Sequence, residues 1–366
     1  MRERDITLDC IRIFAVFSVI SIHFFWNSGY YDQIFHGKRI LLMTIMRSFF
    51  MICVPLFIIL TGYLMGDKIL SLKYYLRIQK TIGTYFLASI ACVLYKVIWQ
   101  GIQYNLKSFF LGVLDFTAAD YAWYIEMYIG LYLLIPFLNL IYKGLNNQKQ
   151  KQVLIVTLLI LTVGPATMNI FNFNDAEWWL HPASSMVYQK IFPAWWSGIY
   201  PLLYYYIGCY IKEYNLKMNI KKSIIWTTVC TILLGILCFY RSYGSTFVWG
   251  SWADYNSLFV VIMSCLAFNI IHKCTWLNRC PFLLKKGIKK LSGLVLGIYL
   301  VSYIFDTIFY TVLQEKVTEI SCRWKYYFVI VPVIFLCSMC LSIILDIIYK
   351  EGEKLFRGMG KLSLNK

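Results

Sequence analysis

The first apolar stretch of the chain, residues 8–26, carries two side chains that could do chemistry, Arg12 and His23. Ionisable groups are costly in the hydrocarbon of a membrane, so they mark functional sites there. Eleven residues at about 100° each come to about 20° past three full turns, which places both side chains on one face of a helix. They are about 16 Å apart along that helix, roughly half the hydrocarbon thickness. The spacing predicts a charged anchor and a titratable base at the two ends of one pathway.

Two further residues bear on how this pair would work. Histidine exchanges protons near neutral pH, so His23 is a candidate general base for a hydroxyl; the alternative is a histidine hydrogen-bonded between packed helices. Asp9 lies three residues before Arg12 and is expected to neutralise it as a helical ion pair. Glu126 is expected at the same depth as His23, where it either orients that histidine or is an interfacial carboxylate.

Two cations, Arg77 and Lys80, are three residues apart where the third apolar stretch begins. On one face of a helix they could hold phosphate groups, and cations that merely flank a membrane span explain their presence equally well. Asp306 lies deep in a later apolar stretch and must face protein or water rather than lipid. A basic group such as Lys96 is its expected partner.

The positions of these residues follow from an unusually apolar chain. Its 366 residues are 60% hydrophobic and 14% charged, whereas soluble domains carry about 25% charged residues. We predict an all-α integral membrane bundle of about ten transmembrane helices, with residues 1–350 as one domain and residues 351–366 as a short basic cytoplasmic tail. The expected spans are residues 8–26, 48–65, 81–100, 123–142, 153–171, 195–211, 223–240, 255–271, 291–312 and 327–349.

The positions of the charges predict the orientation of the chain in the membrane, and the positions of the cysteines argue against metal and disulfide sites. Most of the 35 basic residues fall on one side of these spans, so the positive-inside rule predicts both termini in the cytoplasm. Arg12 is then near the cytoplasm and His23 near the outer face. Cations sorted in this way require no nucleic-acid partner. The 12 cysteines lie mostly inside spans as small hydrophobes, so neither a metal site nor a disulfide framework is expected.

Most of the 12 tryptophans are predicted on the outer side, which differs from an aromatic belt that occupies both interfaces. They could form an outer carbohydrate-binding surface, because tryptophan offers a large apolar face with a polar tip; belt and loop packing are the alternatives. The tryptophans on the outer side are Trp26, Trp99, Trp123, Trp178, Trp179, Trp195, Trp196, Trp249, Trp252 and Trp324.

Four segments together make the chain resemble the acyltransferase-3 family of integral membrane O-acyltransferases. The first is Arg12 followed by ten residues and His23; the others are residues 54–63, VPLFIILTGY, residues 122–136, AWYIEMYIGLYLLIP, and residues 291–300, LSGLVLGIYL. The chain departs from the family where Lys80 replaces the second arginine of an R-x-x-R pair, and where Ser302 replaces a frequent histidine. It also carries no appended esterase-like domain, so the membrane domain is expected to complete the reaction itself.

The resemblance implies transfer of an acyl group, most often acetyl from acetyl-CoA, to a hydroxyl of a cell-surface glycan or lipid-linked saccharide. It implies a multi-pass protein of the cytoplasmic membrane in which Arg77 and Lys80 bind the CoA phosphates. His23 would be the catalytic base, with Arg12 and Glu126 assisting, and the segment of Trp123 and Tyr124 would bind substrate. The alternative function is a transporter or flippase of a small metabolite or acylated sugar, with His23 and Asp306 as a proton relay.

Overall fold

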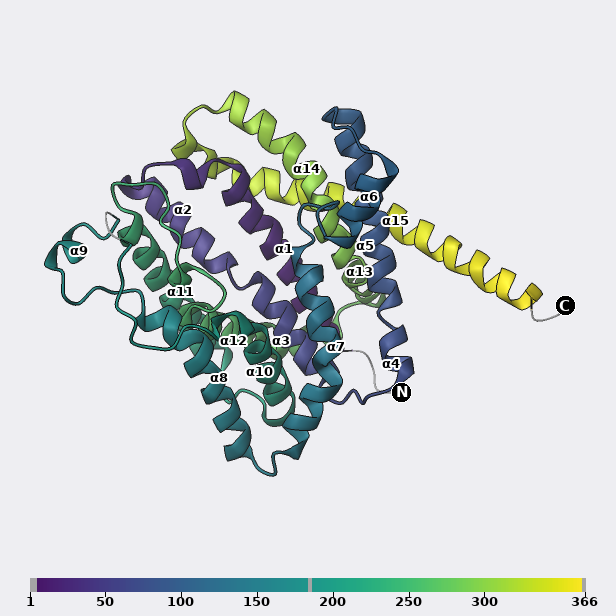
Figure 1. Cartoon of the computed structure of the whole chain (residues 1–366), viewed down its shortest axis with the longest axis horizontal. Helices are drawn as coiled ribbons and strands as arrows, with labels where there is room; N and C mark the ends of the chain where they lie inside the picture. The colour runs from purple at the N-terminus through teal and green to yellow at the C-terminus, as the bar shows by residue number, and fades with distance from the viewer. Residues whose placement is uncertain (1–4, 184–185, 364–366) are drawn as a thin grey trace.

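The computed structural model describes residues 5–183 and 186–363 and builds them into a bundle of helices (Figure 1). The longer helices are α1 (Ile6–Asn27), α2 (Gly37–Phe50), α3 (Cys53–Met65), α5 (Gln79–Trp99), α6 (Leu106–Leu114), α7 (Trp123–Gly144), α8 (Gln148–Met168), α10 (Tyr200–Tyr214), α11 (Ile220–Ser242), α12 (Leu258–Lys273), α13 (Phe282–Ser292), α14 (Val295–Lys316) and α15 (Tyr327–Ser363). The short elements are α4 (Leu72–Leu76), α9 (Ala176–Leu180), η1 (Tyr30–Asp32), η2 (Ser197–Ile199), η3 (Ser251–Ala253), η4 (Thr275–Arg279) and η5 (Ile320–Tyr326).

Nine helical segments within the described ranges are long and apolar enough to cross a membrane, which confirms an all-α multi-pass membrane protein. Four of them join adjacent helical elements: α2 with α3 in Gly37–Met65, α4 with α5 in Leu72–Trp99, α12 with η3 and η4 in Ser251–Arg279, and α15 with η5 in Ile320–Leu355. The span predicted at residues 195–211 corresponds to α10, whose 15 residues are fewer than the about 20 needed to cross hydrocarbon. The expected domain boundary at residue 350 falls inside α15, which continues to Ser363.

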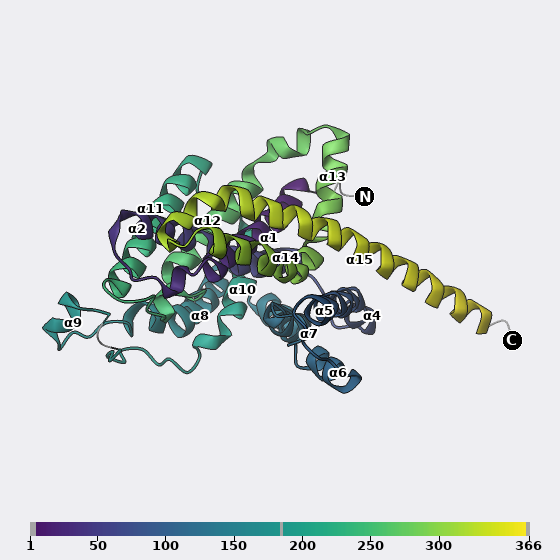
Figure 2. The same cartoon turned by 90° about the horizontal axis from the view of Figure 1, so that it is seen from above.

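Helix α1 is the centre of the bundle. It packs against α2, α3, α12, α13, α14 and α15, and Figure 2 shows it lying among them. The cause is the chemistry of its side chains, since Asp9, Arg12 and His23 on a lipid-facing helix would lose the solvation that neighbouring protein groups supply. These side chains therefore favour a position for α1 inside the bundle rather than at its lipid-facing edge.

Glycines bring α3 and α10 into backbone contact. A Cβ atom on Gly62 would collide with the backbone carbonyl of Tyr205, and one on Gly208 would collide with that of Ile59. Small residues allow this approach in membrane proteins, where close packing replaces the hydrophobic effect between helices. The short α10 is thus held by α3, and three consecutive tyrosines at its middle, Tyr204, Tyr205 and Tyr206, are buried.

A reciprocal pair of tyrosines ties α4 to α7. The Tyr74 hydroxyl donates a 2.6 Å hydrogen bond to the carbonyl of Tyr132, and the Tyr132 hydroxyl donates one of 2.6 Å to the carbonyl of Tyr74. Their rings stack with centroids 4.5 Å apart. Because Arg77 directly follows α4, this contact sets the position of Arg77 relative to α7.

Buried arginines organise the loops at the predicted outer side. Arg241 donates to the carbonyl of Pro182 at 2.9 Å and to the Tyr188 hydroxyl at 2.6 Å. Its guanidinium lies 4.5 Å from the centre of a Trp178 ring and 4.7 Å from a Trp252 ring. Both indoles are buried, so loop packing accounts for these two of the outer tryptophans.

The glycine contact generates a stability prediction. Gly62→Ala places a methyl group against the Tyr205 backbone, which cannot rotate away, and should lower the free energy of unfolding by about 1–3 kcal/mol. The matched control is Gly130→Ala on α7, where a Cβ has open space. Thermal unfolding in lipid nanodiscs measures both variants; an unchanged midpoint for Gly62→Ala would contradict the close contact.

Candidate active site

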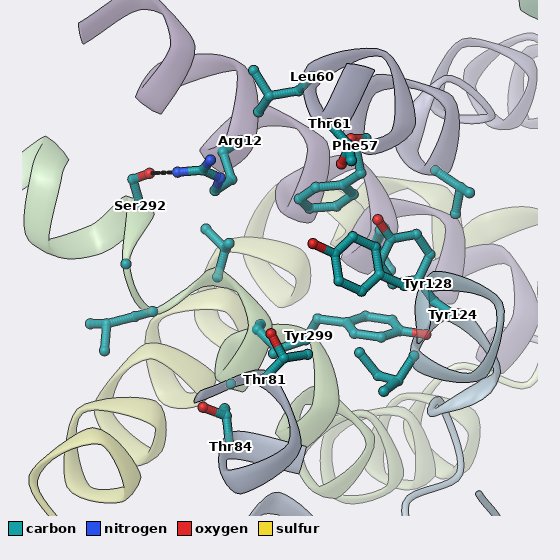
Figure 3. A pocket seen from close by; sticks show the side chains of 18 of the residues that line it. Arg12, Phe57, Leu60, Thr61, Thr81, Thr84, Tyr124, Tyr128, Ser292 and Tyr299 are labelled. Atoms are coloured by element: carbon teal, nitrogen blue, oxygen red, sulfur yellow. Dashed lines mark hydrogen bonds between the residues drawn. The ribbon is translucent and has the colours of Figure 1, made fainter. Parts of the chain in front are cut away.

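One cavity of about 460 Å³ runs between α1, α3, α5, α7, α14 and α15. Arg12 and His23 both line it, as their shared helix face predicts. Figure 3 shows Arg12 and Ser292 on one wall and the rings of Phe57, Tyr124 and Tyr128 gathered on another. The wall is largely apolar between its ends. The cavity therefore offers a passage for a thin molecule with a polar group at each end.

Arg12 is fixed at one end of the cavity by a small polar network. Its Nη1 donates to the Ser292 hydroxyl at 2.9 Å and lies 3.5 Å from Asp9. Ser292 in turn donates to the buried Asp9 carboxylate at 2.7 Å. The predicted ion pair of Asp9 with Arg12 is confirmed. The side chain of Arg12 remains 27% exposed, so it can still meet an anion in the cavity.

His23 is paired with a carboxylate at the other end. Its Nδ1 lies 3.1 Å from Oδ2 of Asp306, which is fully buried on α14. The Tyr121 hydroxyl donates to the same oxygen at 2.8 Å, and the Tyr121 ring packs against the imidazole with centroids 3.8 Å apart. Asn27 donates to the Tyr121 hydroxyl at 3.2 Å. Three elements far apart in sequence thus hold one imidazole.

This contact decides which nitrogen of His23 is available. A carboxylate accepts hydrogen bonds, so the proton of a neutral imidazole lies on Nδ1, toward Asp306. Nε2 is then left with its lone pair, and His23 lines the cavity. A histidine oriented in this way by a carboxylate can take a proton from a hydroxyl and return it to a leaving group.

The carboxylates differ from the sequence-based expectation. Glu126 is exposed and is not among the residues that line the cavity, so the structure does not place it beside His23. Asp306 takes that position. Lys96, its expected partner, instead lies 2.7 Å from Asp120 and 5.4 Å from the Tyr303 ring. The rotation of α7 about its axis decides whether Glu126 faces the cavity, and depth in the sequence alone does not reveal that rotation.

The candidate phosphate-binding cations do reach the cavity. Arg77, between α4 and α5, and Lys80, on α5, both line it together with Arg12. Lys80 lies 4.0 Å from Asp346 on α15, and Asp346 also lies 2.5 Å from Lys350. Arg77 and Lys80 are exposed, so an anionic group can approach them from the water. The cationic end therefore combines α1 with the segment of α4 and α5.

Trp123 and Tyr124 also line the cavity, near the end of His23. Trp123 stacks on Tyr255 with ring centroids 5.9 Å apart. Ser302, in contrast, is fully buried and donates to the carbonyl of Tyr299 on its own helix. It makes no contribution to the cavity wall within the described residues.

Sequence reasoning missed Tyr121 and Asn27 and gave Asp306 a different partner. Asn27 lies four residues after His23, one helical turn away, so helix periodicity alone could have suggested it. Tyr121 comes from the segment before α7, and its hydroxyl points to α14. That contact joins residues 185 positions apart, which pattern analysis of one sequence does not reveal.

The cavity and its two polar ends lie within the region of similarity to known proteins. The sequence matches the family described as the acyltransferase domain, acyltransferase-3, over residues 5–347. No curated protein and no solved structure matches the chain. The matched region includes Arg12 and His23, which lie at the ends of the cavity, and Asp306, which pairs with His23. The chain therefore belongs to the acyltransferase-3 family of membrane acyltransferases.

Proposed function

We propose that the protein transfers an acetyl group from acetyl-CoA to a hydroxyl of a cell-surface glycan or lipid-linked saccharide. The observation that carries the proposal is the single cavity that joins Arg12, Arg77 and Lys80 to His23. Cations suit the phosphates of CoA, and the apolar wall suits its thin pantetheine arm. The donor would bind from the cytoplasm, and the acceptor would meet it at the outer end, in the cytoplasmic membrane.

The proposed reaction uses His23 as base and then as acid. Nε2 of His23 takes the proton of the acceptor hydroxyl while the hydroxyl oxygen attacks the thioester carbonyl. The C–S bond breaks, and the CoA thiolate receives the proton from the imidazolium. Asp306 holds Nδ1–H throughout and stabilises the transient positive charge on the ring. Tyr121 keeps the carboxylate in place through its hydrogen bond.

The base is tested by His23→Ala. The variant should lose about 10²–10⁴-fold in acetyl transfer and in acetyl-CoA hydrolysis, because a positioned base contributes a factor of that size. It should still bind acetyl-CoA, since the cationic end is untouched. The measurements are CoA release and calorimetric binding of acetyl-CoA by protein in nanodiscs. Transfer at the wild-type rate would end the proposal for His23.

The behaviour of the wild-type protein toward acetyl-CoA distinguishes the acyltransferase from the transporter. A folded wild-type protein that neither binds nor hydrolyses acetyl-CoA would reject the acyltransferase proposal. Proton-gradient-dependent movement of a metabolite or acylated sugar in that case would favour the transporter, whose relay would be the same His23–Asp306 pair.

The carboxylate assignment is tested by Asp306→Asn beside Glu126→Gln. Asparagine can keep the contact to His23 but cannot hold the ring in its charged form, so kcat should fall at least about 10²-fold. Glu126→Gln should cost far less, because Glu126 is exposed and outside the cavity wall. The reverse order of the two effects in a CoA-release assay would restore Glu126 as the partner of His23.

Donor binding is tested at the cationic end. Arg77→Ala should raise the Kd of acetyl-CoA about tenfold, since a charge-assisted contact to phosphate is lost at a partly solvated site. Lys73→Ala is the matched control: it removes a positive charge from the same segment, but Lys73 does not line the cavity. Equal weakening by both variants would indicate general surface charge rather than a phosphate site.

A further inference from the structure

Three aromatic rings gather just beyond the end of the cavity where His23 lies. Trp26 lies 5.7 Å from Tyr31 and 5.9 Å from Trp249, and Tyr31 lies 4.6 Å from Trp249, between ring centroids. Trp26 is 62% exposed and Trp249 is 49% exposed. We call these three residues the outer aromatic cluster. It presents two large apolar faces to the surroundings of the molecule.

Helix geometry aligns this cluster with the cavity. Trp26 follows His23 by three residues, which is about one turn of α1. At about 100° per residue its direction falls between those of Val19 and Ile22, and both of these line the cavity. Trp249 belongs to the loop that leads to Tyr255, another residue of the cavity wall. The cluster therefore lies over the outer end of the cavity.

Lipid contact does not account for the cluster. A belt residue faces the hydrocarbon edge of a bundle, whereas Trp26 ends the one helix that six others surround. Figures 1 and 2 both show α1 inside the bundle. Trp26 therefore lies at the end of a central helix, on the side of α1 that lines the cavity.

A buried arginine, Arg47, also fixes the position of the outer aromatic cluster. Arg47 is 2% exposed; its Nε donates to the Tyr31 hydroxyl at 2.9 Å, and Nη2 donates to the Ala253 carbonyl at 3.3 Å. Its guanidinium lies 5.9 Å from the centre of the Trp249 ring. An arginine buried in this way fixes both η1 and the loop of Trp249. Rings fixed before a ligand arrives lose little entropy when it binds.

An exposed carboxylate lies in the same loop as Trp249, five residues further along the chain. Asp254 is exposed and directly precedes Tyr255, whose backbone N–H it accepts through Oδ1 at 2.6 Å. Its other oxygen can accept hydrogen bonds from hydroxyl groups. Aromatic faces that receive C–H surfaces, in a loop that also carries an acceptor for hydroxyls, are suited to a sugar ring.

We propose that the outer aromatic cluster, with Asp254, binds a saccharide ring of the acceptor and directs one of its hydroxyls toward His23. This inference rests on the proposed function, because it assigns the acceptor of the same site. It names the binding surface as well as the ligand class, and it places the sugar one helical turn beyond the base.

The test is binding of the full-length protein in nanodiscs, without acetyl-CoA, to a printed array of oligosaccharides built from hexoses, N-acetylhexosamines and deoxyhexoses. Nanodiscs avoid detergents with sugar headgroups, which would compete. The wild type should bind at least one class of saccharide. Trp26→Ala and Trp249→Ala should each weaken that binding about tenfold, the value of a lost stacking contact. Trp26→Phe keeps an aromatic face and should retain most of the binding.

The matched control is Trp195→Ala, which removes another outer tryptophan, 90% exposed, that does not line the cavity. It should bind saccharides as the wild type does, and thermal unfolding shows whether each variant is folded. Absence of wild-type binding to every saccharide would overturn the inference, as would equal loss in Trp195→Ala or full binding by folded Trp26→Ala.

The two proposals fail in distinguishable ways. Saccharide binding that depends on Trp26, in a wild type that does not turn over acetyl-CoA, keeps this site and rejects the acyltransferase proposal. Acetyl-CoA turnover by a wild type that shows no Trp26-dependent saccharide binding does the reverse.

Discussion

The contact between Asp306 and His23 is the constraint on which much of the structure depends. An ionisable group with no exposure inside an apolar bundle must find its partner in the protein, because neither lipid nor water is available to it. Asp306 finds an imidazole on α1 and a hydroxyl from the segment before α7. These bonds require α14 and the segment before α7 to lie beside His23 of α1. The geometry around His23 and the arrangement of helices are therefore one requirement.

The same argument explains why one helix occupies the centre. Besides His23, α1 carries Asp9 and Arg12, which are bound to Ser292 at the end of α13. Their partners come from other elements, α13 for Asp9 and Arg12 and α14 for His23. Six helices pack around α1, and the cavity occupies the remaining side. Because Arg12 and His23 both belong to α1, the direction of α1 sets the long axis of the cavity.

At the predicted outer side, buried arginines have aromatic rings as their partners. Arg47 and Arg241 are buried among tyrosine, phenylalanine and tryptophan faces and donate to backbone carbonyls. Four of the tryptophans predicted at the outer side fall into two groups. Trp178 and Trp252 are buried structural partners of Arg241, whereas Trp26 and Trp249 are exposed. Loop packing accounts for the first two, and the proposed saccharide surface uses the second two.

The sequence by itself determined the class of fold and the axis of the site. Apolar runs must form helices in a membrane, since every backbone group has to be bonded within the segment, and the helical period puts Arg12 and His23 on one face. Both are local properties of the chain. Only the tertiary structure decided the partners: Asp306 pairs with His23 across 283 residues, Lys96 pairs with Asp120, and Glu126 is exposed. Such pairs depend on how each helix is rotated against its neighbours, and that rotation is set by packing between residues far apart in the chain.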